Sequence, residues 1–179
     1  MNRYVAVPIT GKLLLPPRPL DPAPLEFQCE PFPRVAKELL PLLEANWREM
    51  AVYNDRTPLA PDWPYYFEAS RLGVLQLFTV RCSGVIVGYL TVLIGPYRHS
   101  VCSRHCDVDI VYVDSGFRQG FTGLKLFRLM EKKMRELKVN IIRCESVAHF
   151  KNNNGLGIDI LLKRLGYKPV ATVHGKYLE

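Results

Sequence analysis

The stretch VDSGFRQGFTGLKLF, residues 113–127, joins a strand-like apolar run to an amphipathic helix. The loop between them contains Arg118, Gly120 and Gly123. The first amides of a helix lack intrahelical partners and bear partial positive charge, so a loop of small residues before a helix can bind an anion, most often phosphate. Arg118 adds a guanidinium that can donate two parallel hydrogen bonds to a phosphate. The alternative is that both glycines only let the loop turn and the helix approach a sheet.

The segments around this stretch predict an α/β chain. Residues 74–82, the turn Ser83-Gly84 and residues 85–96 are rich in β-branched residues and predict a β-hairpin. A third strand is expected at 106–113, with Asp107 and Asp109 on the same side as Val111 and Val113. The rest of the pattern predicts a helix at 121–138, a strand at 139–147, a short helix at 157–166 ended by Gly166, and one or two final strands at 167–178. A strand, helix and strand in this order predict a right-handed crossover between parallel strands.

The N-terminal part has a different composition. More than half of the fourteen prolines lie in residues 1–33, which predicts an extended proline-rich arm packed on one domain formed by residues 34–179. Apolar residues at helical spacing predict a helix at 34–50 that Pro41 bends or splits. A second helix is expected to begin near Asp62 and to end at Gly73.

Composition limits the classes of function. The 179 residues are 48% hydrophobic and 23% charged, which is typical of a globular domain. The net charge of +7 favours an anionic ligand or partner, and it permits nucleic-acid binding, although no block of like charges indicates it. No apolar run reaches membrane-spanning length, and the start lacks a signal-peptide cleavage site, so the expected location is the cytoplasm.

The cysteines and histidines raise the question of a metal. Five cysteines are an odd number, which argues against a disulfide framework. His99, Cys102, His105 and Cys106 are zinc-ligand types, but no second pair elsewhere completes a site, and four ligands so closely spaced cannot easily form a tetrahedron. We therefore predict a polar loop that enters a strand, and no metal.

The loop and its neighbours resemble the GNAT superfamily of N-acetyltransferases, and in style its short phage-encoded members. The family's acetyl-CoA motif, roughly Val-x-Pro-x-Tyr-Arg-x-x-Gly-x-Gly/Ala, aligns without gaps with Val113-Asp-Ser-Gly-Phe117-Arg118-Gln-Gly-Phe121-Thr-Gly123, and the similarity covers residues 73–177. The resemblance implies a mixed, mostly antiparallel sheet with a splayed parallel pair, flanked by helices. It implies acetyl-CoA as cofactor, wedged between the strands near 106–113 and 140–147. The implied cofactor-binding residues are Tyr112, Val113, Arg118, Gln119, Gly120, Phe121, Thr122 and Gly123.

Two residues depart from the family pattern. Phe121 stands where the first motif glycine usually lies, so its side chain must point away if the loop is to hold a diphosphate, and Gly120 could supply the flexibility. Leu162 stands where many members have a tyrosine that serves as general acid.

The mechanism that the resemblance implies is direct attack of an amine on the thioester, with the oxyanion held by a backbone N–H near Val113. An amine with a pKa of about 10.4 must first lose a proton, so a general base is useful. The candidates are Asp107, Asp109 and Glu145, with His105 and His149 as further options. Asp107 and Asp109 would raise one another's pKa if they lay close together. Each carboxylate could instead be a strand-end group in water or paired with an arginine.

Two other features could belong to the site. Cys144 lies near the expected acyl group, but no partner in the sequence activates it, so we predict a buried structural thiol. The aromatic residues Trp63, Tyr65, Tyr66 and Phe67 precede the hairpin, and they line an acceptor pocket or pack against the sheet.

The sequence thus predicts an acetyl-CoA-dependent N-acetyltransferase acting on an amine of a protein or small molecule. The basic surface disfavours polycationic acceptors and suits an acidic protein or an RNA-borne aminoacyl group. The alternative is a GNAT-like binding module without catalysis that contacts a protein through its proline-rich arm. A homodimer also stays open.

Overall fold

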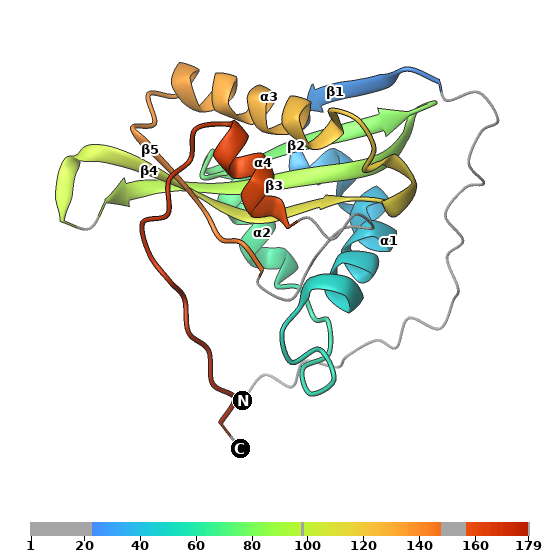
Figure 1. Cartoon of the computed structure of the whole chain (residues 1–179), viewed down its shortest axis with the longest axis horizontal. Coiled ribbons are helices and arrows are strands. Elements are labelled where there is room, and N and C mark those ends of the chain that lie inside the picture. The colour runs from blue at the N-terminus through green and yellow to red at the C-terminus, as the bar shows by residue number, and fades with distance from the viewer. Residues whose placement is uncertain (1–22, 98, 148–156, 179) are drawn as a thin grey trace.

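Five strands form one mixed sheet at the centre of the molecule. The computed structural model describes residues 23–97, 99–147 and 157–178 (Figure 1). The strands lie in the order in which they occur in the chain, and β4 and β5 are the only parallel neighbours among the described residues. Their bounds are Leu25–Cys29 (β1), Leu75–Cys82 (β2), Val85–Tyr97 (β3), Ser100–Val113 (β4) and Ile141–Cys144 (β5). This arrangement confirms the predicted fold class.

Helices cover both faces of the sheet (Figure 1). On one face, α1 (Phe32–Met50) and α2 (Trp63–Arg71) bury apolar residues against Leu77, Tyr89 and Tyr112. On the other face, α3 (Thr122–Glu136) packs Phe127 and Met130 into the larger cluster, and α4 (Ile158–Arg164) adds a short turn of helix there. None of the described helices is long and apolar enough to cross a membrane.

The turn residues explain the hairpin of β2 and β3. Ser83 and Gly84 have φ angles of 51° and 80°, and two successive positive φ values match the twist of antiparallel strands. Farther along β3, Gly88 faces Val113, and a Cβ added there would lie 3.0 Å from the Val113 side chain. Glycine at this position therefore lets β3 approach the end of β4 closely.

Several predictions about the N-terminal part need correction. Residues 25–29 are an edge strand of the sheet rather than part of an arm, and residues 1–22 lie outside the described residues. Helix α1 continues through Pro41 without a break. The carbonyl that Pro41 leaves without its helical partner belongs to Lys37, which is exposed and can bond to water, while buried residues on both sides of Pro41 hold the helix on the sheet. Helix α2 begins after Asp62 as predicted, with the Asp62 side chain accepting from the backbone N–H of Tyr65.

The other corrections concern strand lengths. Strand β4 begins at Ser100 and not at Cys106, so Cys102 and His105 lie within it and not in a loop. Strand β5 has only four residues, and the final strands predicted after Gly166 are absent from the described chain. Residues 168–178 are instead mostly exposed, and Tyr177 contacts Tyr53 and Arg56. Pro169 removes a backbone donor from this segment, which disfavours strand pairing.

Candidate functional site

The two parallel strands separate after a short paired region, and a pocket lies where they diverge. Residues 105–108 of β4 pair with residues 141–144 of β5, and within the described residues this pairing does not continue beyond Val108. The pocket has a volume of about 490 Å³. Its walls come from α1, α2, residues 51–61, and the strands β3, β4 and β5, and it includes Asp109, Cys144 and Glu145. The splayed pair that the resemblance implied is therefore present.

Asp109 enters this pocket because β4 contains an irregularity in its pairing. The register between β3 and β4 shifts between Thr91 and Val92, where Ile110 pairs with Thr91 and Val108 pairs with Val92. The extra residue is Asp109. One of its carboxylate oxygens, Oδ2, accepts hydrogen bonds at 3.2 Å from the hydroxyl groups of Tyr66 and Thr91. Val113 is buried in the core under α3, and Val111 packs against that core while also reaching the pocket, whereas Asp109 bonds to Tyr66 of α2, so the single face predicted for these residues is wrong.

The environment changes the acidity of Asp109. Burial by the pocket walls raises the pKa of its carboxyl group above the ordinary value, while hydrogen bonds from Tyr66 and Thr91 act in the opposite direction. The residue still stays accessible from the open pocket. Burial and the nearby Asp109 charge also raise the pKa of Tyr66, which keeps this phenol protonated as a donor. Asp109 is thus a carboxylate with fixed donors and an increased tendency to take up a proton.

Asp107 has a different environment although it lies on the same strand. It pairs in register with Arg143 of β5, and Arg143 donates from Nε to Oδ1 at 2.6 Å and from Nη2 to Oδ2 at 2.9 Å. Asp107 does not line the pocket. Asp109 owes its raised pKa to burial and not to a neighbouring carboxylate, so the predicted carboxylate pair is wrong. The pairing of Asp107 with Arg143 corresponds to the arginine-paired carboxylate that the sequence offered as an alternative to a general base.

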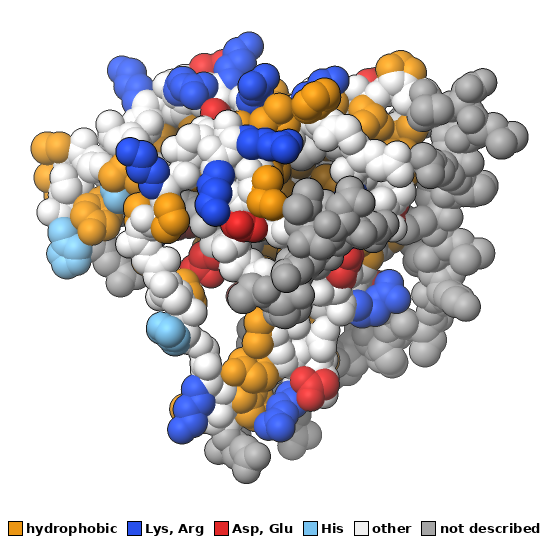
Figure 2. Space-filling view, viewed as in Figure 1, with side chains coloured by type: hydrophobic (Ala, Val, Ile, Leu, Met, Phe, Trp, Pro, Cys, Tyr) orange, Lys and Arg blue, Asp and Glu red, His pale blue; other side chains and the backbone are white. Residues whose placement is uncertain are grey.

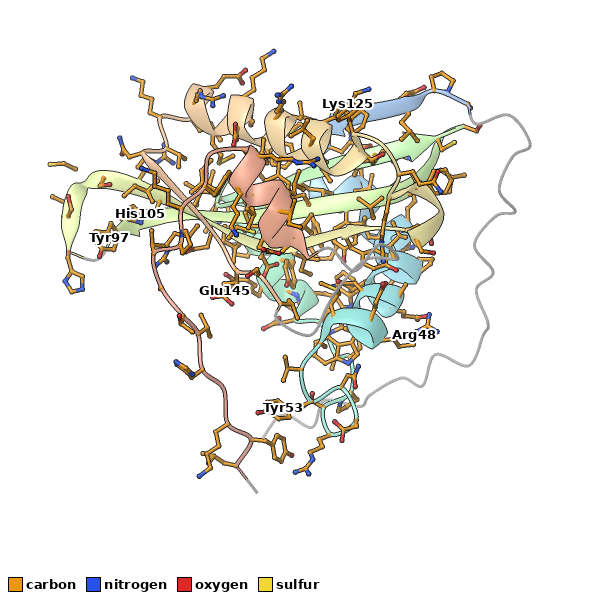
Figure 3. The ribbon with its side chains drawn as sticks, in the orientation of Figure 1. Arg48, Tyr53, Tyr97, His105, Lys125 and Glu145 are labelled. Atoms are coloured by element: carbon orange, nitrogen blue, oxygen red, sulfur yellow. The ribbon has the colours of Figure 1, made fainter. Side chains whose placement is uncertain are left out.

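Strand β5 brings Cys144 and Glu145 to the pocket. Burial raises the pKa of Cys144 to about 12, so this residue is a neutral thiol near pH 7, as expected for a structural cysteine. Glu145 is exposed and lies at the end of β5 (Figure 3). It therefore sits at the rim of the pocket, where solvent can reach it. His149 lies outside the described residues.

The loop before α3 differs from the prediction in the role of Arg118. Both terminal nitrogens of Arg118 donate to the carboxylate of Glu49 in α1, at 2.5 and 2.6 Å. Its Nε donates to the carbonyl of Val113 at 2.6 Å, and the guanidinium lies 5.1 Å from the Tyr112 ring centroid. The Arg118 hydrogen bond holds the pKa of Glu49 below its usual range. Arg118 thus joins the loop to α1, and Tyr112 packs in the core under α1 and α2.

The loop backbone nevertheless fits a diphosphate. Helix α3 begins with Phe121 as N-cap, the Phe121 side chain makes no capping hydrogen bond, and the first turn contains no acidic residue. The Phe121 side chain is 66% exposed, as the resemblance required, and Gly120 has a φ of 68° that favours glycine. A Cβ at Gly123 would lie 3.0 Å from Leu161, so this glycine also lets α4 pack against α3. The first-turn amides of α3 and the loop before them are the groups that could hold a diphosphate.

A basic surface continues from this helix. Lys125, Arg128, Lys132 and Arg135 belong to α3, and Figure 2 shows Lys and Arg side chains gathered over this helix.

Leu162, which replaces the general acid of many family members, is buried in the core beneath α3. His105 lies far along the β3–β4 hairpin, stacked 4.2 Å from the Tyr97 ring, and it does not line the pocket (Figure 3). Within the described residues, no group of three metal-ligand side chains gathers.

The structure also shows site residues that sequence reasoning missed. Tyr89, Thr91 and Trp47 line the pocket together with the predicted Trp63 and Tyr66. Tyr65 and Phe67 do not line it. A signal was present in the sequence, because Tyr89 and Thr91 are two residues apart in an otherwise apolar strand and so share one face.

Solved structures with the same fold are acetyltransferases, whereas no protein-family model and no curated protein matches the sequence. An aminoglycoside acetyltransferase from an uncultured soil metagenomic sample is 16% identical, with a TM-score of 0.64 over 87% of this chain and 96% of that chain. A ribosomal-protein-alanine N-acetyltransferase from Brucella melitensis is 17% identical, with a TM-score of 0.61 over 87% and 100%. A predicted acetyltransferase from Clostridium acetobutylicum, solved with acetyl-CoA, is 8% identical, with a TM-score of 0.60 over 86% and 96%. The fold of this chain is therefore the fold of the GNAT N-acetyltransferases.

Proposed function

We propose that the protein is an acetyl-CoA-dependent N-acetyltransferase in which Asp109 is the general base. The observation that supports this most directly is the position of Asp109, which lies in a pocket at the point where β4 and β5 diverge. Its raised pKa favours this role, because a carboxylate takes a proton from an ammonium group more readily when the pKa of the carboxyl group is closer to that of the amine. The acetyltransferases of the same fold add support through that shared fold.

Each residue has a defined task in this proposal. Acetyl-CoA supplies an acetyl group activated as a thioester, and the first-turn amides of α3 and the loop before them hold its diphosphate. An acceptor amine enters the pocket beside Asp109, which takes a proton from the amine nitrogen and leaves the lone pair free to react. Tyr66 and Thr91 hold the Asp109 carboxylate in place through Oδ2. The apolar walls exclude water, which strengthens the interaction between the amine and the carboxylate.

Arg118 and Glu145 have supporting roles. Arg118 positions the start of the loop by bonding to Glu49 and to the Val113 carbonyl. Glu145 at the rim attracts a cationic acceptor. Neither residue needs to touch the reacting atoms.

A second candidate function is a GNAT-like binding module without catalysis. Two observations favour it: the Arg118 guanidinium is engaged with Glu49, and Phe121 replaces a motif glycine. This candidate predicts no measurable affinity for acetyl-CoA.

Calorimetric titration with acetyl-CoA separates the two candidates. We expect binding, followed by release of the CoA thiol when a panel of primary amines is added. Asp109→Asn should keep the affinity for acetyl-CoA and lose the thiol release. Absence of binding would rule out the enzyme and leave the module, whereas binding with equal turnover in Asp109→Asn would remove Asp109 as the base.

A further inference from the structure

The pocket walls indicate which amines the protein accepts. The wall formed by α1, α2 and residues 51–61 is mainly apolar, and we call it the aromatic wall after the rings of Phe32, Trp47 and Trp63; it also contains Leu39, Leu43, Met50 and the polar Asn46. Among the described residues that line the pocket, Asp109 and Glu145 are the only charged ones, and none is Lys or Arg. The pocket therefore combines negative charge at the strands with an extended apolar surface opposite.

We propose that the acceptor is a primary amine with a single positive charge on a long apolar or aromatic body. The assignment deepens the proposed acetyl transfer and rests on it for the fate of the amine, but binding of the amine can be measured without it. The volume of about 490 Å³ lies within the range of about 300–1,000 Å³ that is common for small-molecule pockets.

The amine end has two oxygen partners on the sheet. Asp109 supplies a carboxylate, and Tyr89 adds a phenol oxygen from the neighbouring strand β3. Tyr89 lines the pocket but is 1% exposed, and its buried hydroxyl has no hydrogen-bond partner among the described residues. A buried polar atom without a partner is costly, so a ligand that bonds to it gains affinity. An ammonium group has three N–H donors and can donate to both oxygens.

The remainder of the ligand meets the aromatic wall. Aromatic rings there can stack on an aromatic body or cover a methylene chain. Trp47 is fixed in place because its indole N–H donates to the carbonyl of Thr57 at 3.2 Å, which also holds residues 51–61 against α1. A second positive charge at the far end would lose its hydration against apolar side chains. A carboxylate there would find no Lys or Arg among the described lining residues and would be repelled by Asp109.

Three amines of the same length test this inference: n-hexylamine, 1,6-diaminohexane and 6-aminohexanoate. Trp47 and Trp63 are the two tryptophans of the chain, and both line the pocket, so tryptophan fluorescence reports binding directly without any acyl donor. We expect n-hexylamine to bind at least about tenfold more tightly than either of the others. Affinity should also increase about fourfold for each methylene added from n-butylamine to n-hexylamine. Equal affinities for the three amines, or no dependence on chain length, would overturn the inference.

A variant in the aromatic wall tests the inference through an expected gain of affinity, which a folding defect would not produce. Asn46 lies in the wall on α1, and Asn46→Asp adds a carboxylate with almost no change in shape. We expect this variant to bind 1,6-diaminohexane at least about tenfold more tightly than the wild type does, because the second ammonium gains a partner. The control is Asn140→Asp on the surface, where the side-chain oxygen can still accept from the Arg104 N–H, and no change in preference is expected.

The outcomes separate this inference from the proposed function. If the amine preference holds but no acetyl group is transferred, the pocket assignment stands and the proposed enzyme activity fails. If acetyl transfer occurs with equal efficiency for all three amines, the activity stands and the substrate class assigned here is wrong. Failure of Asn46→Asp to improve diamine binding would also contradict the placement of the amine's apolar body against α1.

Discussion

The two halves of β4 use the same kind of residue in opposite ways. Where β4 still pairs with β5, Asp107 faces Arg143 in register and forms a two-bond ion pair on the surface. Where the strands have separated, Asp109 faces a pocket and accepts from two hydroxyl groups. Two aspartates, two positions apart, therefore differ in role: Asp107 forms a surface ion pair, and Asp109 lines the pocket. Strand pairing, rather than residue type, separates the two.

The strongest test of this contrast removes each carboxylate in turn. We expect Asp109→Asn to lower kcat by about 100-fold or more, because a positioned general base contributes about 10²–10⁴-fold. Asp107→Asn should change kcat by less than twofold, since an exposed ion pair contributes about 0–1 kcal/mol to stability and takes no part in the site. Steady-state assays of thiol release with a primary amine measure both variants. Equal losses in the two variants would show that both halves of β4 serve the reaction.

The second comparison concerns the carboxylate that holds Arg118. If Arg118 positions the loop through Glu49, then Glu49→Gln and Arg118→Ala should each weaken acetyl-CoA binding by about three- to tenfold, because both release the loop from α1. Each should also lower stability by about 1–3 kcal/mol, between the values for exposed and fully buried ion pairs. Calorimetry and denaturant unfolding measure the two effects.

A direct phosphate contact by Arg118 predicts a different pattern. In that case Glu49→Gln frees the guanidinium and tightens acetyl-CoA binding, while Arg118→Ala alone weakens it. Arg118→Lys is the matched control, because it keeps the charge and cannot reproduce the two parallel bonds to Glu49. A tighter complex with Glu49→Gln would assign Arg118 to the cofactor.

Sequence patterns predicted most of the scaffold and only part of the site. The hairpin, α2, α3 and the parallel crossover depend on local signals such as Ser83-Gly84, Asp62 and the apolar stripe of α3, and these were read correctly. The register shift at Asp109 depends on how β3 and β4 pair, which no local pattern records. The Arg118–Glu49 pair joins residues far apart in the chain, and the motif alone favoured a phosphate contact for Arg118. The predicted final strands are absent from residues 167–178, where Pro169 removes a backbone donor that strand pairing would use, so β propensity alone misjudged this segment.

A smaller effect should distinguish the carboxyl groups of Asp109 and Glu49 by the pH dependence of stability. Burial raises the pKa of Asp109, so its ionisation costs stability as the pH rises through the folded-state pKa, and no cost exists below the unfolded value of about 3.9. We therefore expect Asp109→Asn to melt slightly above the wild type at pH 7 and equally near pH 3. Glu49, whose pKa the Arg118 hydrogen bond lowers, has the opposite sign. Its stabilisation is present above about pH 4.3 and is lost as the pH falls, so Glu49→Gln should melt below the wild type at pH 7 only.

Thermal melts across pH 3–8 check both signs in one experiment. Asp107→Asn serves as the control from the paired half of β4. A lower melting temperature for Asp109→Asn at pH 7 would mean that its hydrogen bonds outweigh burial, and Asp109 would then be a structural carboxylate like Asp107.

The smallest expected effect concerns Phe121, the residue that most weakens the motif. Its side chain is largely exposed at the N-cap of α3 and makes no capping hydrogen bond. Phe121→Gly should therefore change the melting temperature by no more than about 2 °C, since exposed positions contribute within about 0.5 kcal/mol and glycine is tolerated at an N-cap. Acetyl-CoA affinity should increase by less than about threefold, because the ring already points away from the amides.

Phe121→Ala separates the ring from the backbone in this last test, because alanine removes the ring and keeps a Cβ. Equal, small effects of Ala and Gly would show that Gly120, with its positive φ, already provides the flexibility that the missing glycine would supply. A large gain with Gly alone would mean that the loop is held in a conformation unsuited to a diphosphate. A large gain with both would mean that the ring blocks the amides, and the binding module would then become the better account of the unmodified chain.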